Sequence, residues 1–145
     1  MVYKKEGRGM KALTIHPYFA MQIVGGVKTV EVRTWKTDFR GDILITSSAK
    51  KGKYLVPGHA LGVVTLKDIV PLTKKHLKAA LLDRMPEVDA YAWILENPRF
   101  IKPIPVKGKL SLWTYPDDTK IEYLHPTTQE ELQELLDTYW EPITC

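Results

Sequence analysis

The sequence contains a single cysteine, Cys145, at its last position. One thiol cannot form a disulfide within the chain, and it cannot build a cysteine-based metal cluster. A chain without disulfides fits a reducing compartment. No apolar run approaches the length of a membrane span, and no signal-peptide pattern opens the chain. From these absences we expect a cytoplasmic protein without a membrane partner.

Several motifs of catalysis and cofactor binding are also missing. The chain has neither the glycine-rich loop of P-loop enzymes nor that of dinucleotide-binding folds. No cysteine and histidine residues stand at the spacing of a zinc site, and no Ser-His or Cys-His pairing is readable. We therefore expect no metal and no cofactor. The four histidines are scattered, and each is expected to be an ordinary polar residue: His16, His59, His76 and His125.

The composition is that of a globular protein. With 145 residues, 44% of them hydrophobic and 26% charged, the chain can bury a hydrophobic core without the help of disulfides or metal ions. We expect a flexible basic lead-in over residues 1–10 and a single domain over residues 11–145, with a monomer favoured. The formal net charge of +4 permits a polyanionic partner such as RNA but does not require one.

The hydrophobic pattern predicts more strand than helix. Apolar alternation predicts about six strands, over residues 11–15, 28–35, 42–49, 60–70, 90–96 and 106–115. Between the last two, Asn97-Pro98-Arg99 predicts an extended turn, followed by a proline-rich edge segment over residues 100–105. Gly62 is expected to mark a bulge or a tight bend. Together these features predict an α+β fold built on a small closed β-barrel with peripheral helices.

Three helices are predicted from spacing and capping residues, over residues 17–24, 74–82 and 128–139. The first starts at Pro17 and is stopped by Gly25-Gly26, for which we expect positive φ angles. The free N–H groups at its start make the His16-Pro17-Tyr18 corner a possible anion site. The last has the clearest signal, since Thr128 and Glu131 form a capping box.

The segment of residues 25–35 is the most informative stretch. If it forms a strand, Glu31, Arg33 and Trp35 share one face, while Val30 and Val32 face a core. Lys28 stands at the entry of the strand, where a long cation can reach over the same face. One interpretation is an edge strand with an ion pair, and the other is a functional site. The strand alone does not separate them.

Cations and aromatic residues accompany this segment. Such a set suits nucleic acid, since Lys and Arg contact phosphates while aromatic faces stack on bases. Ser48, Lys50 and Lys51 follow a predicted core strand and suit phosphate contact, although the same composition describes an ordinary loop. Trp113 and Trp140 are expected in the core. The full set is Tyr18, Lys28, Arg33, Trp35, Lys50, Trp93, Arg99 and Lys107.

The order of these motifs resembles a known family. Residues 26–35 follow the pattern G-x-K-x-x-E-x-R-x-W, and Arg40-Gly41 precedes the next strand. Later, Asn97-Pro98-Arg99 is followed by P-x-P-x-K-G over residues 103–108. Over residues 11–115 this spacing resembles the ASCH (activating signal cointegrator homology) domain. The resemblance implies a PUA-like β-barrel with a cleft that binds RNA or a nucleotide.

The resemblance also suggests roles for individual residues. Carried over by position, the cleft would contain Lys28, Glu31, Arg33, Asn97 and Arg99. A few members of the family are hydrolases that act on acetylated cytidine or on RNA. The acetylcytidine branch has a catalytic lysine, which matches Lys28, and a catalytic threonine, whose position is Glu31 here. We therefore expect a nucleic-acid-binding module that prefers single-stranded or structured RNA, with a hydrolase using Lys28 and Glu31 as the alternative.

Overall fold

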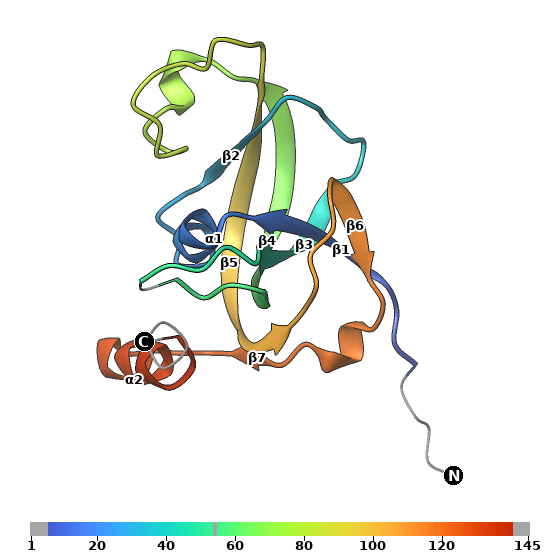
Figure 1. Ribbon diagram of the computed structural model, residues 1–145, viewed down its shortest axis with the longest axis vertical. Helices are drawn as coiled ribbons and strands as arrows, with labels where there is room; N and C mark the ends of the chain where they lie inside the picture. Colours follow the sequence, from blue (N-terminus) through green and yellow to red (C-terminus); the bar gives the residue numbers. More distant parts are fainter. Residues whose placement is uncertain (1–5, 54, 141–145) are drawn as a thin grey trace.

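The computed structural model describes residues 6–53 and 55–140, which form one mixed β-sheet with helices at its periphery (Figure 1). The strand order is β2-β5-β4-β3-β1-β6, and β7 pairs with β5. Only β1 and β3 run parallel among these pairs. The elements are β1 (Met10–Ile15), α1 (Pro17–Val24), β2 (Val30–Arg33), β3 (Gly41–Ser47), β4 (His59–Pro71), η1 (Lys74–His76), β5 (Tyr91–Pro105), β6 (Leu112–Tyr115), η2 (Asp118–Lys120), β7 (Tyr123–Leu124) and α2 (Gln129–Tyr139).

The α+β class is confirmed, but the expectation of a closed barrel is wrong. The sheet has seven strands, and within the described residues its end strands β2 and β6 do not pair with each other. The last β1–β6 pair joins Leu13 and Leu112, so the edge of β1 is open beyond that point. At this open edge, Arg33 Nη2 donates a hydrogen bond to the Thr14 carbonyl oxygen at 3.2 Å, which a neighbouring strand would otherwise bind.

The two longest strands, β4 and β5, pair antiparallel along most of their length (Figure 1). The predicted turn at Asn97-Pro98-Arg99 is wrong, because β5 continues through it. Asn97 adopts a φ of 52° and the register with β4 shifts there, so these residues form a bulge rather than an end. A bulge is a position where a strand tolerates proline. The predicted strand at 106–115 shrinks to β6, which begins at Leu112.

The predicted helix at 74–82 is also wrong, since only the short 3₁₀ helix η1 forms there. The carbonyl groups that would continue a helix are used by the segment leading into β2. Ala79 O accepts hydrogen bonds from the backbone of Thr29 and Val30, and Ala80 O accepts one from the Lys28 side chain. Leu81 then adopts a φ of 57°, which ends any helical path.

The first helix, α1, forms as predicted and packs on the sheet. Gly26 has a φ of 84°, whereas Gly25 stays in the right-handed helical region, so only the second glycine provides the expected stop. Gly62 lies at a register shift of β4, as expected for a bulge. A Cβ atom at Gly62 would lie 2.5 Å from Val24 Cγ1, so the glycine permits the close approach of α1.

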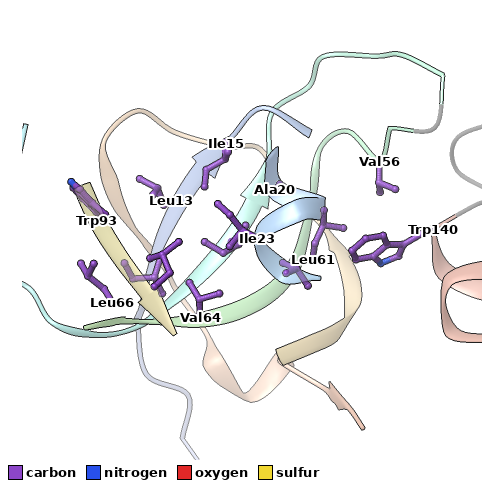
Figure 2. Packing of buried hydrophobic residues seen from close by; sticks show 14 residues of the cluster. Leu13, Ile15, Ala20, Ile23, Val56, Leu61, Val64, Leu66, Trp93 and Trp140 are labelled. Atoms are coloured by element: carbon purple, nitrogen blue, oxygen red, sulfur yellow. The ribbon is translucent and has the colours of Figure 1, made fainter. Parts of the chain in front are cut away.

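The main hydrophobic core lies between α1 and one face of the sheet (Figure 2). Trp93 is fully buried in it, and Trp140, which follows α2, packs at its border near Val56 and Leu61. Trp113 is buried in a second cluster on the opposite face. Both Trp113 and Trp140 therefore lie in the core, as expected.

At the N-terminal end, the described part of the lead-in touches the domain. The Arg8 backbone N–H donates to the Asp118 carboxylate at 3.0 Å, and the Asp118 backbone N–H donates to the Arg8 carbonyl oxygen. Met10 already belongs to β1. The basic residues Lys4 and Lys5 lie outside the described residues, as does Cys145. Within the described part of the chain, no helix has the length and apolar character needed to cross a membrane.

Candidate nucleic-acid interface

Three charged side chains, one from the segment before β2 and two from β2 itself, form a compact cluster, the β2 triad of Lys28, Glu31 and Arg33. Glu31 accepts from both Nε and Nη2 of Arg33, at 3.0 and 2.9 Å. Its other oxygen lies 3.6 Å from Lys28 Nζ. Two cations and one carboxylate leave one net positive charge. Glu31 and Arg33 share a face as the alternation predicted, but Glu31 is only 7% exposed, so the triad is not a surface ion pair.

Lys28 is the more unusual member, because its side chain is 3% exposed. Its ammonium donates to Ala80 O at 2.6 Å and lies 5.0 Å from the centre of the Phe19 ring. Burial lowers the pKa of the Lys28 ammonium, because desolvation penalises its charged form. The Glu31 carboxylate opposes this shift and Arg33 assists it. Desolvation is the largest of these effects, so the pKa falls although a carboxylate lies beside the ammonium.

Arg33 keeps part of its hydrogen-bonding capacity free. Its Nε and Nη2 are used by Glu31 and Thr14, whereas Nη1 has no protein partner within the described residues. The side chain is 23% exposed. A guanidinium held on one side with donors free on the other is preorganised to bind a phosphate or carbonyl oxygen.

The β2 triad lines a cavity of about 390 Å³ between β2, the end of β1 and the start of α1. The residues around the triad were not recognised from sequence as parts of a cleft, because they come from three separate segments. They are Thr14, Ile15, His16, Phe19, Val32 and Leu82. Of these, only His16 belongs to a segment that the sequence singled out, the His16-Pro17-Tyr18 corner.

The His16-Pro17-Tyr18 corner forms one wall of this region. The His16 Nδ1 atom accepts from the Tyr18 backbone N–H at 3.1 Å and thereby caps α1. The donor that an anion would use is therefore already bonded. Tyr18 is 47% exposed and packs edge-on against Phe19, so it remains available for stacking.

The lysines predicted to contact phosphate lie on a neighbouring loop. Ser48 donates its backbone N–H to Ile15 O, which places the start of this loop next to the cavity. Lys50 and Lys51 are exposed and do not line the cavity. Gly58 donates to Ser48 O and accepts from Val106 N, so this loop adjoins the segment that carries Lys107.

The two tryptophans of the predicted binding set serve packing. Trp35 is half-buried and packs edge-on against Trp93, with ring centres 4.8 Å apart. Trp93 Nε1 donates to the Trp35 carbonyl oxygen at 3.2 Å. Because Trp93 is fully buried, the idea that it offers a face to a base is wrong.

The structure separates Asn97 and Arg99 from the β2 triad. Side chains alternate along a strand, and Arg99 lies on the sheet face of Ile101, whereas Glu31 lies on the face of Trp93. Arg99 forms a two-pronged ion pair with Asp42 at 2.9 and 3.0 Å. Asn97 contributes its carbonyl oxygen to Arg99 Nε from the bulge.

Asp42, the partner of Arg99, lines a cavity of about 810 Å³, which also contacts Phe39 and Tyr123. Hydrogen bonding from Arg99 lowers the pKa of Asp42, and the same bond raises the pKa of Arg99. This cavity lies on the face away from the β2 triad. Among the described residues, no three His, Cys, Asp or Glu side chains gather in a way that could hold a metal.

Comparison with protein families gives a match to the ASCH domain over residues 13–108. Activating signal cointegrator 1 of Homo sapiens is 31% identical over 134 aligned residues, which cover 75% of this chain. The chain spans only 22% of the length of that relative. The matched segment includes the β2 triad and Arg99, but it excludes α2.

Solved structures of an ASCH protein from Zymomonas mobilis share the fold. One is 23% identical with a TM-score of 0.57 and covers 88% of this chain and 94% of its own. A mutant of that protein is 20% identical with a TM-score of 0.57, covering 92% and 99%. At these identities the likeness concerns the fold.

Proposed function

The chain belongs to the ASCH domain family, and from this premise we propose that it is a nucleic-acid-binding module that holds RNA over the cavity of the β2 triad. The observation that carries the proposal is the Arg33 guanidinium. It is fixed by Glu31 and Thr14, yet its Nη1 donors point to no protein acceptor within the described residues. Together with buried Lys28, it gives the cavity a net positive charge suited to phosphate or a base carbonyl.

A basic rim beside the cavity supports a polyanion rather than a small neutral ligand. Lys50 and Lys51 lie exposed on the loop after β3, and Lys107 lies exposed on the adjoining segment. Lysines along a groove beside an aromatic side chain such as Tyr18 are typical of proteins that bind single strands. We therefore propose that the phosphates follow this rim while one nucleotide enters the cavity.

The test is a titration with short single-stranded RNA at several salt concentrations. Arg33→Lys should keep the fold but weaken binding by about tenfold, because lysine lacks the second donor of the fork. Lys50→Ala or Lys51→Ala should reduce the slope of log K against log salt by about 0.7 per lost phosphate contact. Lys75→Ala, on η1, is the matched control and should bind as the wild type does. Binding that does not depend on salt, or no binding at low salt, contradicts the proposal.

A hydrolase is the second candidate, and the lowered pKa of Lys28 favours it. A neutral amine in this cavity could take a proton from water while the water attacks the acetyl carbonyl of an acetylated cytidine. The resulting ammonium would return this proton to the cytidine amine as the amide C–N bond breaks, which gives acetate and cytidine. The experiment is incubation with acetylcytidine and with short RNAs, beside Lys28→Ala. Loss of turnover in the variant supports this role, and absence of turnover in the wild type leaves the binding module.

The activities and partners of the human relative are not carried over, because the chain spans only about a fifth of that protein. What the family adds is the position of the β2 triad within the matched segment. The proposed function therefore rests on the residues of this chain and on the charge that they place at the cavity.

A further inference from the structure

The 107–111 loop, Lys107-Gly108-Lys109-Leu110-Ser111, carries an unusually exposed leucine. Leu110 is 93% exposed, more than any other large hydrophobic residue among those described. Lys107 and Lys109 lie exposed on the same loop. A single exposed leucine is common on protein surfaces. The conformation and anchoring of this loop set Leu110 apart.

The loop is fixed against β1 on both sides of Leu110. A Cβ atom at Gly108 would lie 2.6 Å from the Thr14 side chain, so the loop backbone sits directly on Thr14. The Thr14 hydroxyl accepts from Trp113 Nε1 at 3.0 Å, and Lys109 Nζ lies 5.9 Å from the centre of the Trp113 ring. These contacts hold both ends of the loop while leaving its tip in solvent.

The backbone at the tip is strained. Ser111 has a φ of 59°, a left-handed conformation that residues other than glycine adopt rarely. Such strain persists only where the surrounding structure imposes it, and it concentrates at sites that bind ligands. Here it turns the chain sharply into β6 at Leu112, leaving Leu110 outside the sheet.

The register of the sheet brings Ser111, at the end of this loop, level with Thr14, whose carbonyl oxygen binds Arg33 of the β2 triad. Leu13 pairs with Leu112, so Thr14 and Ser111 are the next residues along the two strands. The Ile15 carbonyl oxygen points toward β3, because it accepts a hydrogen bond from Ser48 N. Successive carbonyl groups of a strand point to opposite sides, so the Thr14 carbonyl oxygen points toward β6. That oxygen accepts from Arg33 Nη2, which puts the guanidinium at the end of β6 beside the 107–111 loop.

We propose that Leu110 is an apolar wedge that inserts beside a base of the RNA bound at the β2 triad and unstacks it from its neighbour. The inference rests on the proposed function. Apolar side chains that separate bases are a known device of nucleic-acid-binding proteins, and flanking cations fix the backbone while the wedge enters. Lys107 and Lys109 provide such cations on the same loop, just before Leu110, which favours nucleic acid over an apolar protein partner.

The experiment uses a short single-stranded RNA with one 2-aminopurine between purines, because the fluorescence of this base rises when it is unstacked. The full chain should increase the fluorescence on binding. Leu110→Ser should abolish most of the increase and weaken binding by about tenfold, the effect of losing one buried leucine side chain. The salt dependence should stay unchanged, because Leu110 contacts no phosphate.

Two further variants separate the outcomes. Val88→Ser removes another exposed apolar side chain, 63% exposed and far along the chain, and should leave both signals as in the wild type. Lys109→Ala should reduce the salt slope and keep the fluorescence increase. The wedge proposal is wrong if Leu110→Ser binds RNA with the wild-type affinity and fluorescence increase. It is also wrong if Val88→Ser loses as much affinity and fluorescence as Leu110→Ser does. In both cases the proposed function still stands. If the wild type binds no RNA, both fail.

Discussion

At the scale of single residues, Glu31 is the charge on which the site depends. It lies between Lys28 and Arg33 and is nearly inaccessible to solvent. Removing one partner of a buried ion pair leaves the other charge without compensation, and this costs more than the pair contributes. Glu31 therefore stabilises the fold by permitting two cations to stand at one cavity.

Glu31→Gln should lower the free energy of unfolding by about 2–4 kcal/mol, because Lys28 then stays buried without a carboxylate. For a chain of this size the melting temperature should fall by roughly 5–12 °C. Thermal melting by circular dichroism measures the change. Glu96→Gln is the control, since Glu96 makes an exposed pair with Lys67 at 3.8 Å and should melt within about 2 °C of the wild type. Equal melting of both variants would show that the Glu31 carboxylate is not needed for stability.

At the scale of elements, the contact of α1 with β4 sets the position of the cavity wall. Gly62 permits it, because the space where its Cβ would stand is filled by Val24 and by the Arg99 carbonyl oxygen. His16 caps α1 and Phe19 lies in it, and both line the cavity. The packing of α1 on the sheet therefore also fixes the positions of these two residues.

Gly62→Ala should destabilise the protein by about 1–3 kcal/mol, because the new methyl group would overlap Val24 and a backbone oxygen. Urea unfolding measures the loss. Gly52→Ala is the matched control, since the nearest atoms there belong to the flexible Leu55 side chain. A Gly62→Ala protein as stable as this control would mean that α1 can shift without cost.

The Asp42–Arg99 pair joins β3 to β5 across β4, with Thr65 as a third member that donates to Asp42 at 2.7 Å. Hydrogen bonding from Arg99 lowers the pKa of Asp42 in the folded state. A carboxyl whose folded pKa is depressed contributes stability above its unfolded pKa, and the contribution disappears as pH falls through the folded pKa.

Arg99→Gln should therefore be less stable than the wild type at about pH 7, by at most about 1 kcal/mol because both side chains are partly exposed. The difference should shrink below about pH 4 as Asp42 becomes protonated. Urea unfolding of both proteins at the two pH values measures it. A difference that persists undiminished in acid would show that the Arg99 side chain acts through packing and not through Asp42.

At the scale of the whole molecule, α2 extends the domain beyond the segment matched by the family. Thr128 Oγ1 accepts from Glu131 N, as the capping box predicts, while the Glu131 carboxylate bonds to Thr127. Trp140, at the end of this helix, is 5% exposed and lies at the border of the main core (Figure 2). Its ring packs edge-on against Phe100, with ring centres 5.5 Å apart. One tryptophan thus attaches α2 to the main core.

Trp140→Ala should cost about 3–5 kcal/mol through lost packing. Trp140→Phe should change stability by less than about 1 kcal/mol, because the buried Nε1 has no partner within the described residues and its loss offsets some of the lost area. Thermal melting of both variants tests this. A large loss in the phenylalanine variant would point to an acceptor for the indole N–H.

The sequence by itself determined the features that depend on neighbours along the chain. The alternation over residues 30–33 placed Glu31 and Arg33 on one face, Pro17 and Gly26 bounded α1, and Thr128 marked the start of α2. The family motif identified the β2 triad and the α+β class. These predictions hold because strand periodicity, capping and positive φ are set within a few residues.

Only the tertiary structure decided what these residues can do. Lys28 is buried because Ala80, 52 residues later in the chain, closes over it, and this contact also replaces the predicted helix at 74–82. The bulge at Asn97 lets β5 continue, which keeps Arg99 in the sheet on the face away from Lys28. Desolvation and strand pairing depend on residues distant in sequence, so local patterns could reveal neither the lowered pKa of Lys28 nor the separation of the two motifs.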